Sequence, residues 1–261
     1  MGVALEGAQM RLALIQNDTV WADRDANFAR LSPLIDRAAA EGARLILLPE
    51  MFSTGFVVDR DDIGEPEGGP SSQFLADHAA RHRVWVGGSC PETSPDDPRP
   101  HNSFVLAGPH GEIHRYRKIH RFTYGGEDRH FRPGDQLVTV RIDDISVSMF
   151  VCYDLRFADE FWRLAPDTDL YLVPANWPAS RREHWLALLK ARAIENQAFV
   201  AGCNRVGTGG GLDYSGDSRI FDPLGATVAE ADGSETIITA EIIRDRVREV
   251  REQFPFLRDR R

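Results

Sequence analysis

Three segments of the sequence place a reactive side chain at or near the end of an apolar run. Cys152 follows ISVSMFV, Glu50 follows LILLP, and Lys118 lies in the basic and aromatic stretch RYRKIHRF. A thiol nucleophile, a carboxylate base and a cation beside a developing oxyanion are the groups that acyl transfer from an amide requires. Each residue is a weak signal by itself, but together the three predict a hydrolytic site.

Each of the three residues also has a structural interpretation. Free cysteine is among the most buried residue types, and Cys90 and Cys203 also end apolar strands, so cysteine type alone does not identify a nucleophile. Glu50 could be a salt-bridged strand terminus and Lys118 part of a solvated basic loop. We expect a helical turn directly after Cys152, whose N-terminus would favour the thiolate.

The elements that must position these residues alternate between strands and helices. Apolar residues at helical spacing predict a helix over 23–41, which Gly42 ends. The other expected helices cover 70–82, 181–196 and 244–253, and the expected strands cover 11–16, 43–50, 84–89, 103–107, 112–116, 137–142, 145–152, 169–175 and 198–204. Short turns within 103–116 and 137–152 indicate antiparallel hairpins. The pattern predicts an α/β fold with mixed sheets covered by helices.

Composition narrows the class of protein further. Among 261 residues, Lys and Arg number 31 and Asp and Glu 40, and the resulting net charge of −9 argues against binding nucleic acid. No apolar run approaches the roughly 18–20 residues of a membrane-spanning helix, so no membrane partner is expected. Three widely spaced cysteines fit a reducing compartment, which predicts a cytoplasmic protein.

The segments LILLPEMF, RKIH and VCYDLRF, in this order, resemble the signature segments of the nitrilase (carbon–nitrogen hydrolase) superfamily. PANWP (174–178) and CNRVG (203–207) make the chain most similar to the bacterial omega-amidase branch. The resemblance implies a single-domain, four-layer α-β-β-α sandwich over residues 10–261, preceded by an irregular leader over 1–9. Ala158 departs from the pattern, because the bacterial relatives have proline there, and we expect the helix start near Arg156 to differ.

The resemblance also implies an activity and a set of site residues. The expected enzyme needs no cofactor or metal and hydrolyses the terminal amide of 2-oxo acid omega-amides, such as 2-oxoglutaramate, through a cysteine thioester. Its implied catalytic residues are Glu50, Lys118 and Cys152, with Glu127 helping to position the substrate. Its implied substrate-binding residues are Tyr153, Arg156, Asn176 and Trp177. Relatives pair their subunits, so we expect at least a homodimer, formed through 156–164 and the C-terminal helix.

Two other functions remain open. The chain could be a different hydrolase of the superfamily, acting on a nitrile, an N-carbamoyl compound or an aliphatic amide. It could also be a catalytically silent scaffold with the same fold.

Several other patterns are given structural interpretations. His78 and His82, at i and i+4, are read as a solvated helix face because no third metal ligand is in view. The glycine-rich run 207–211 is read as a flexible loop, and Arg192 and Glu195 as an ion pair beneath the site.

Overall fold

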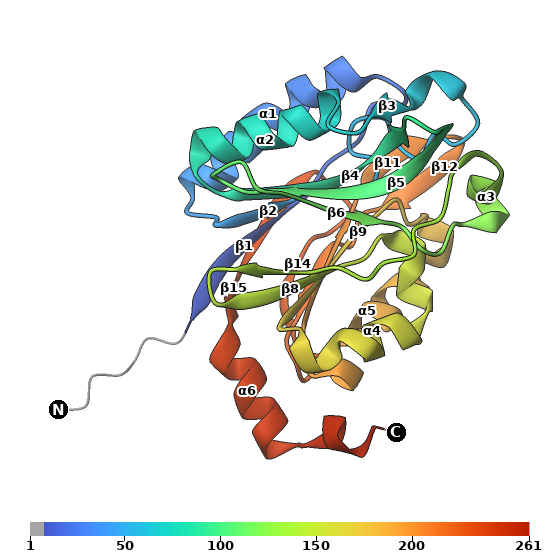
Figure 1. Ribbon diagram of the computed structural model, residues 1–261. Helices are drawn as coiled ribbons and strands as arrows, with labels where there is room; N and C mark the ends of the chain where they lie inside the picture. The colour runs from blue at the N-terminus through green and yellow to red at the C-terminus, as the bar shows by residue number, and fades with distance from the viewer. Residues whose placement is uncertain (1–7, 261) are drawn as a thin grey trace.

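Two mixed β-sheets pack face to face at the centre of the computed structural model, which describes residues 8–260 (Figure 1). The first sheet has the order β15-β1-β2-β4-β5-β6, with β3 paired to β4. Its strands are β1 (Gln9–Gln16), β2 (Leu45–Leu47), β3 (Glu65–Pro66), β4 (Trp85–Ser94), β5 (Asp97–Ala107), β6 (Ile113–Arg117) and β15 (Thr236–Ile243). Strands β1, β2 and β4 run parallel, whereas β15, β5 and β6 pair antiparallel to their neighbours.

The second sheet has the order β14-β13-β10-β9-β8-β7 and also contains a parallel centre, formed by β8, β9 and β10. Its strands are β7 (Thr139–Ile142), β8 (Ile145–Met149), β9 (Leu170–Ala175), β10 (Phe199–Asn204), β13 (Arg219–Phe221) and β14 (Thr227–Glu230). A separate hairpin joins β11 (Val206–Gly209) to β12 (Leu212–Ser215). The carboxyl ends of the parallel strands in both sheets carry the loops that build the site.

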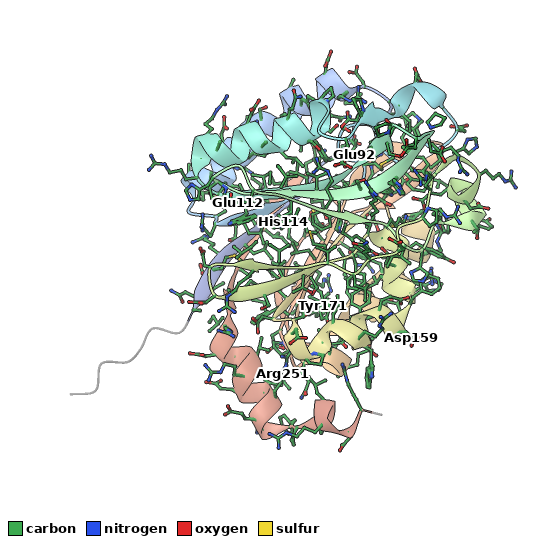
Figure 2. All side chains as sticks on the ribbon, in the orientation of Figure 1. Glu92, Glu112, His114, Asp159, Tyr171 and Arg251 are labelled. Atoms are coloured by element: carbon green, nitrogen blue, oxygen red, sulfur yellow. The ribbon has the colours of Figure 1, made fainter. Side chains whose placement is uncertain are left out.

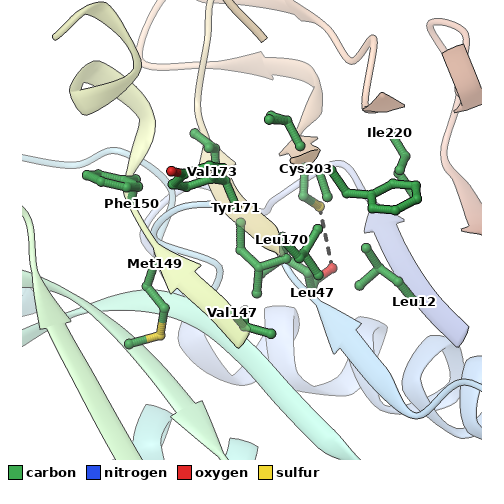
Figure 3. Packing of buried hydrophobic residues seen from close by; sticks show 14 of the residues in the cluster. Leu12, Leu47, Val147, Met149, Phe150, Leu170, Tyr171, Val173, Cys203 and Ile220 are labelled. Carbon is green, nitrogen blue, oxygen red and sulfur yellow. Dashed lines mark hydrogen bonds between the residues drawn. The ribbon is translucent and has the colours of Figure 1, made fainter. Parts of the chain in front are cut away.

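Alternation along the strands explains the layers. Leu12 and Leu14 of β1 belong to the core between the sheets, whereas Ala13 and Ile15 belong to a second core beneath the helices. The contact between the sheets is visible in Figure 3, where Cys203 of the second sheet donates a hydrogen bond to the carbonyl of Leu47 in the first, at 3.4 Å. Side chains fill the space between the ribbons (Figure 2).

Helices cover the outer face of each sheet. α1 (Arg24–Ala40) and α2 (Pro70–His82) lie side by side on the first sheet, and α4 (Ala158–Leu164) and α5 (Arg182–Asn196) lie on the second (Figure 1). Leu31, Ile35 and Ala38 form the buried stripe of α1. The four-layer α-β-β-α sandwich expected from the sequence is therefore confirmed, and the chain forms it as one domain.

The remaining elements are α3 (Glu127–His130), α6 (Arg244–Gln253) and short 3₁₀ turns, of which η3 (Cys152–Arg156) follows β8. Arg251, labelled on α6 in Figure 2, donates hydrogen bonds to the carbonyls of Thr168 and Ala165, and these anchor α6 to the end of the second sheet. Among residues 8–260, no helix is both long enough and apolar enough to cross a membrane.

Most predicted elements are present, and two predictions are wrong in part. The glycine-rich run 207–211 is only partly a loop, because 207–209 belong to strand β11 and only Gly210 and Gly211 form the turn of the β11–β12 hairpin. The C-terminal bound of the leader expected over 1–9 is wrong, because Gln9 already pairs with Ile243 in the first sheet. Residues 1–7 lie outside the described part of the chain. Helix α4, which follows the Cys152 turn, begins at Ala158. The first position of a helix is one that proline also favours, so alanine and proline are both compatible with a helix start at this residue.

Candidate active site

Loops at the carboxyl ends of strands from both sheets bring the site residues together. Glu50 follows β2, and Asn176 directly follows β9 of the other sheet. The backbone N–H of Asn176 donates to Glu50 Oε2 at 2.8 Å, and its side-chain amide donates to the Glu50 carbonyl at 2.6 Å. Asn176 therefore fixes both the backbone and the carboxylate of Glu50 across the sheet interface.

Lys118 lies between two buried carboxylates. Its Nζ atom is 2.9 Å from Glu50 Oε1 and 2.9 and 3.1 Å from the two carboxylate oxygens of Glu127. The Asn102 amide also donates to Glu50 Oε1 at 2.8 Å and to Glu127 Oε1 at 3.1 Å. Glu127 Oε2 accepts a further bond from the backbone N–H of Phe122. The three charged side chains are at most 1% exposed, so their geometry is enforced by packing as well as by charge.

Burial and charge act in opposite directions at this cluster. Burial lowers the pKa of Lys118, but the negative charges of Glu127 and Glu50 outweigh burial and raise that pKa above its ordinary value. Burial raises the pKa of Glu127, and the ammonium of Lys118 opposes the rise. The lysine is therefore a permanent cation in the site.

Cys152 occupies a sharp turn between β8 and η3. Its φ of +46° lies in the left-handed region, a conformation that costs a non-glycine residue of order 1–3 kcal/mol. The buried carboxylate of Asp154 holds the turn, because it accepts hydrogen bonds from Val151 N at 3.0 Å, Tyr116 Oη at 2.8 Å and His120 N at 2.9 Å. The turn directs the thiol away from the strand and into the pocket that it lines.

Burial and the charge of Glu50 favour the thiol form of Cys152 over the thiolate. Burial raises the pKa of Cys152 well above its ordinary value, the charge of Glu50 raises it further, and Lys118 lowers it without reversing the shift. Any preference of the following turn for the thiolate is therefore opposed by burial and by the charge of Glu50. A neutral thiol beside a carboxylate needs that carboxylate as a general base when it attacks.

A pocket of about 460 Å³ opens onto these groups. Glu50, Lys118 and Cys152 line it, as do all four residues expected to bind substrate, namely Tyr153, Arg156, Asn176 and Trp177. Glu127 is not among the lining residues, and its contacts are with Lys118, Asn102 and Phe122. Glu127 thus lies behind Lys118 and outside the lining of the pocket.

Two arginines with aromatic neighbours line the pocket. The Arg156 guanidinium lies 4.8 Å from the ring centroid of Trp177, and that of Arg181 lies 5.3 Å from the ring centroid of Phe122. Among the side chains that the structure describes, neither arginine has a carboxylate within 4.0 Å; Arg156 contacts His184 at 3.2 Å. Both cations are therefore available to an anionic group in the pocket.

Sequence reasoning missed several residues of the site. Asn102 is a polar residue inside strand β5, and its position just before the apolar run SFVLA was the available signal. Arg181 ends the turn that precedes α5, and no local pattern marks it. Leu212 and Tyr214 reach the pocket from strand β12, directly after the run 207–211 that was expected to be a loop.

The other two cysteines and the predicted Arg192–Glu195 ion pair lie outside the pocket lining. Of the three cysteines, all of which the structure describes, Cys152 alone lines the pocket; Cys90 and Cys203 are 0% exposed in the cores. The expected ion pair is confirmed, because Arg192 Nη1 lies 2.7 Å from Glu195 Oε1. Arg192 also donates to the carbonyl of Leu155 at 2.8 Å, which supports η3 from below.

Comparison with known proteins identifies the family. The family model described as "Carbon-nitrogen hydrolase" matches residues 11–252 of the chain. The chain is 40% identical to omega-amidase YafV of Yersinia enterocolitica over 96% of each chain, and 31% identical to 2-oxoglutaramate amidase of Bacillus subtilis over 95% of this chain and 96% of the other. A CN-hydrolase superfamily protein from Xanthomonas campestris, whose crystal structure has an arsenic adduct in the active site, superposes with a TM-score of 0.93. It is 33% identical, and the match covers 97% of this chain and 98% of the other. The chain therefore belongs to the carbon-nitrogen hydrolase family.

Proposed function

We propose that this protein is an omega-amidase that hydrolyses the terminal amide of small 2-oxo acid omega-amides, with 2-oxoglutaramate as the reference substrate. The observation that carries the proposal is one pocket in which a buried thiol lies beside the Glu50–Lys118 pair while free arginines line the same cavity. The similarity to omega-amidase YafV and 2-oxoglutaramate amidase supports the substrate class.

Glu50 acts as the general base through its Oε2 atom. Lys118 and Asn102 already donate to Oε1, whereas Oε2 accepts only the backbone N–H of Asn176 among the described residues. Oε2 therefore takes the Cys152 proton as the sulfur attacks the amide carbon. Proton transfer coupled to attack avoids forming a free thiolate in a site that disfavours it.

The tetrahedral oxyanion is held by Lys118 and the backbone N–H of Tyr153. One N–H of Lys118 bonds Glu50 Oε1 and a second is shared between the two oxygens of Glu127, which leaves the third N–H for the oxyanion. Tyr153 is the second residue of η3, where backbone N–H groups have no partner within the turn. Loss of one such donor typically costs ~10²–10³ in turnover.

Two proton transfers through Glu50 complete the cycle. Protonated Glu50 donates to the amide nitrogen, the carbon–nitrogen bond breaks, and ammonia leaves a thioester on Cys152. Water then attacks the thioester while Glu50 takes one of its protons and returns it to the departing sulfur. Glu127 keeps Lys118 in place throughout these steps, and the product is a dicarboxylic acid.

Arg156 and Arg181 recognise the carboxylate at the other end of the substrate. Guanidinium groups bind carboxylates bidentately, and the aromatic rings of Trp177 and Phe122 hold these two side chains against the pocket wall. A neutral aliphatic amide would leave this contact unmade, so the arginines favour an anionic amide.

Ammonia release and intact mass together test the proposal. Wild-type protein should release ammonia from 2-oxoglutaramate and carry an acyl adduct on Cys152 when mixed with a slow amide. Cys152→Ala should be folded, inactive and free of adduct, whereas Cys90→Ala, which removes a buried thiol outside the pocket, should react normally. Full activity in Cys152→Ala would refute the mechanism.

A substrate panel separates the remaining alternatives. Turnover of a nitrile, an N-carbamoyl compound or a neutral amide, without turnover of 2-oxo omega-amides, would refute the substrate class and leave the mechanism standing. Absence of both turnover and adduct across the panel would favour a catalytically silent scaffold.

Self-association and a cytoplasmic location are also part of the proposal. The segment 156–164 and the C-terminal helix are the proposed contact between two copies. Trp162 on α4 and Phe256, just beyond α6, are exposed aromatic side chains at 41% and 61%. Light scattering should give at least twice the 29.2 kDa chain mass, and a monomer mass would contradict this pairing.

A further inference from the structure

Two histidines and an aspartate meet on the outer helix layer. His78 and His82 lie one turn apart on α2, and Asp36 lies on the adjacent helix α1. One ligand-type atom from each residue lies within 4.8 Å of the other two. The expectation that the histidine pair has no third ligand nearby is wrong, because helix packing supplies one that sequence spacing does not reveal.

Hydrogen bonding fixes the tautomer of His78. The Ser32 hydroxyl donates to the carbonyl of Phe28 at 2.9 Å, so its oxygen accepts the N–H from His78 Nε2 at 3.2 Å. The lone pair of the neutral ring is therefore on Nδ1. His78 is only 5% exposed, and its Nδ1 atom is buried with no hydrogen-bond partner among the described residues.

The His78 lone pair is directed at a carboxylate. Nδ1 of His78 lies 3.6 Å from Asp36 Oδ1, and the same oxygen lies 2.7 Å from His82 Nε2. His78 Nδ1 is a buried acceptor without a partner, although the Asp36 carboxylate that it faces is 47% exposed, and a cation between the two atoms would satisfy the buried one. Burial lowers the pKa of His78, which agrees with a neutral ring at pH 7.

The distances from Asp36 Oδ1 to the two imidazoles bracket the ligand spacing around a small metal ion, and the shorter one is a hydrogen bond with His82 that metal binding would replace. Bonds of ~2.0–2.2 Å in a tetrahedral zinc site place ligand atoms about 3.3 Å apart, and the two measured separations lie on either side of that value. Ser32 also has the position of the outer partner that orients a metal-bound imidazole, because it hydrogen-bonds the ring nitrogen opposite the ligand atom.

We propose that Asp36, His78 and His82 bind a divalent transition-metal ion of the Zn²⁺ type, with a fourth position open to water. Two imidazoles and one carboxylate are a donor set that Zn²⁺ prefers. The ion would join α1 to α2. No residue that lines the active-site pocket comes from either helix, so the metal stabilises the fold and takes no part in amide hydrolysis.

Metal titration of tag-free, chelator-treated protein tests the site. Zn²⁺ in competition with a chromophoric chelator should bind at one equivalent. Asp36→Asn and His82→Ala should each weaken binding by at least about 10-fold, since loss of even an outer-shell partner costs about 10–100-fold. His110→Ala, which removes an exposed histidine elsewhere, should bind as the wild type does.

Two further readouts identify the ligands and the effect. Co²⁺ should give visible bands without a thiolate charge-transfer band, which excludes Cys152 as the ligand. Zn²⁺ should raise the Tm of the wild type and not that of His82→Ala, while amidase activity stays the same in both. The proposal is overturned if the wild type binds no Zn²⁺ at micromolar concentration, or if Asp36→Asn and His82→Ala bind it unchanged.

Discussion

Asn102 and Lys118 donate hydrogen bonds to the same two oxygen atoms, Oε1 of Glu50 and Oε1 of Glu127. One donor is neutral and the other charged, so the amide supports the geometry of the ion cluster without changing its net charge. The shared contacts leave Glu50 Oε2 turned toward Asn176 N, in the position from which it can accept a proton. Asn102 is thus a positioning residue for the general base.

Replacing Asn102 with alanine should reduce kcat far more than it changes KM. A hydrogen bond to a charged group contributes about 1.5–3 kcal/mol, which corresponds to about 10–100-fold in rate. Steady-state kinetics with 2-oxoglutaramate measures both constants. Ser103→Ala is the matched control, because its neighbouring hydroxyl is buried and has no hydrogen-bond partner among the described residues. Equal kcat values for the two variants would rule out the positioning role.

The pH at which Cys152 ionises should fall in Glu50→Gln. The negative charge of Glu50 raises the pKa of the thiol, so a neutral amide in its place removes that contribution and stabilises the thiolate. Thiolate ultraviolet absorbance, measured against the same protein with Cys152→Ser, follows the titration. The variant should form thiolate at lower pH than the wild type and yet fail to turn over, because it has lost its base. An unchanged or higher titration midpoint would contradict the charge assignment.

Local patterns in the sequence predict much of the fold. Helix α2 covers the expected residues 70–82, because Pro70 at its first position and basic residues in its last turn mark both ends. Strand β15, in contrast, pairs with β1 along its whole length although more than two hundred residues separate them. No local pattern encodes such a pairing, so the edge of the first sheet could not be predicted.

The residues of the candidate site also fall into those that local motifs predict and those that only the fold brings together. Motif resemblance named Glu50, Lys118 and Cys152, and the structure brings all three to one pocket. Arg181 and Asn102 were missed because their importance depends on the aromatic ring or the carboxylate that folding places beside them. Asp36 was missed as a partner of the histidine pair for the same reason, since helix packing alone puts it there.

The turn that carries Cys152 should depend on Asp154 for stability. Asp154→Asn replaces one acceptor oxygen with a donor that faces other donors, so the free energy of unfolding should fall by about 3 kcal/mol. Tyr116→Phe removes only one of those donors and should cost about 1–2 kcal/mol. Urea unfolding measures both values. A larger loss in Tyr116→Phe than in Asp154→Asn would show that the Tyr116 hydroxyl, which also accepts from Ile119 N, matters more to the turn than the carboxylate does.

The pocket arginines should act only on anionic substrates. Arg156→Ala and Arg181→Ala each remove a cation that has no carboxylate partner among the described side chains, so kcat/KM for 2-oxoglutaramate should fall by about 10–100-fold. Activity on a neutral amide of similar length should change much less, because that substrate makes no ionic contact. Arg81→Ala on α2, an exposed arginine outside both the pocket and the proposed subunit contact, controls for loss of surface charge. Equal losses of kcat/KM on the anionic and the neutral amide would mean that the arginines shape the pocket without recognising the charge of the substrate.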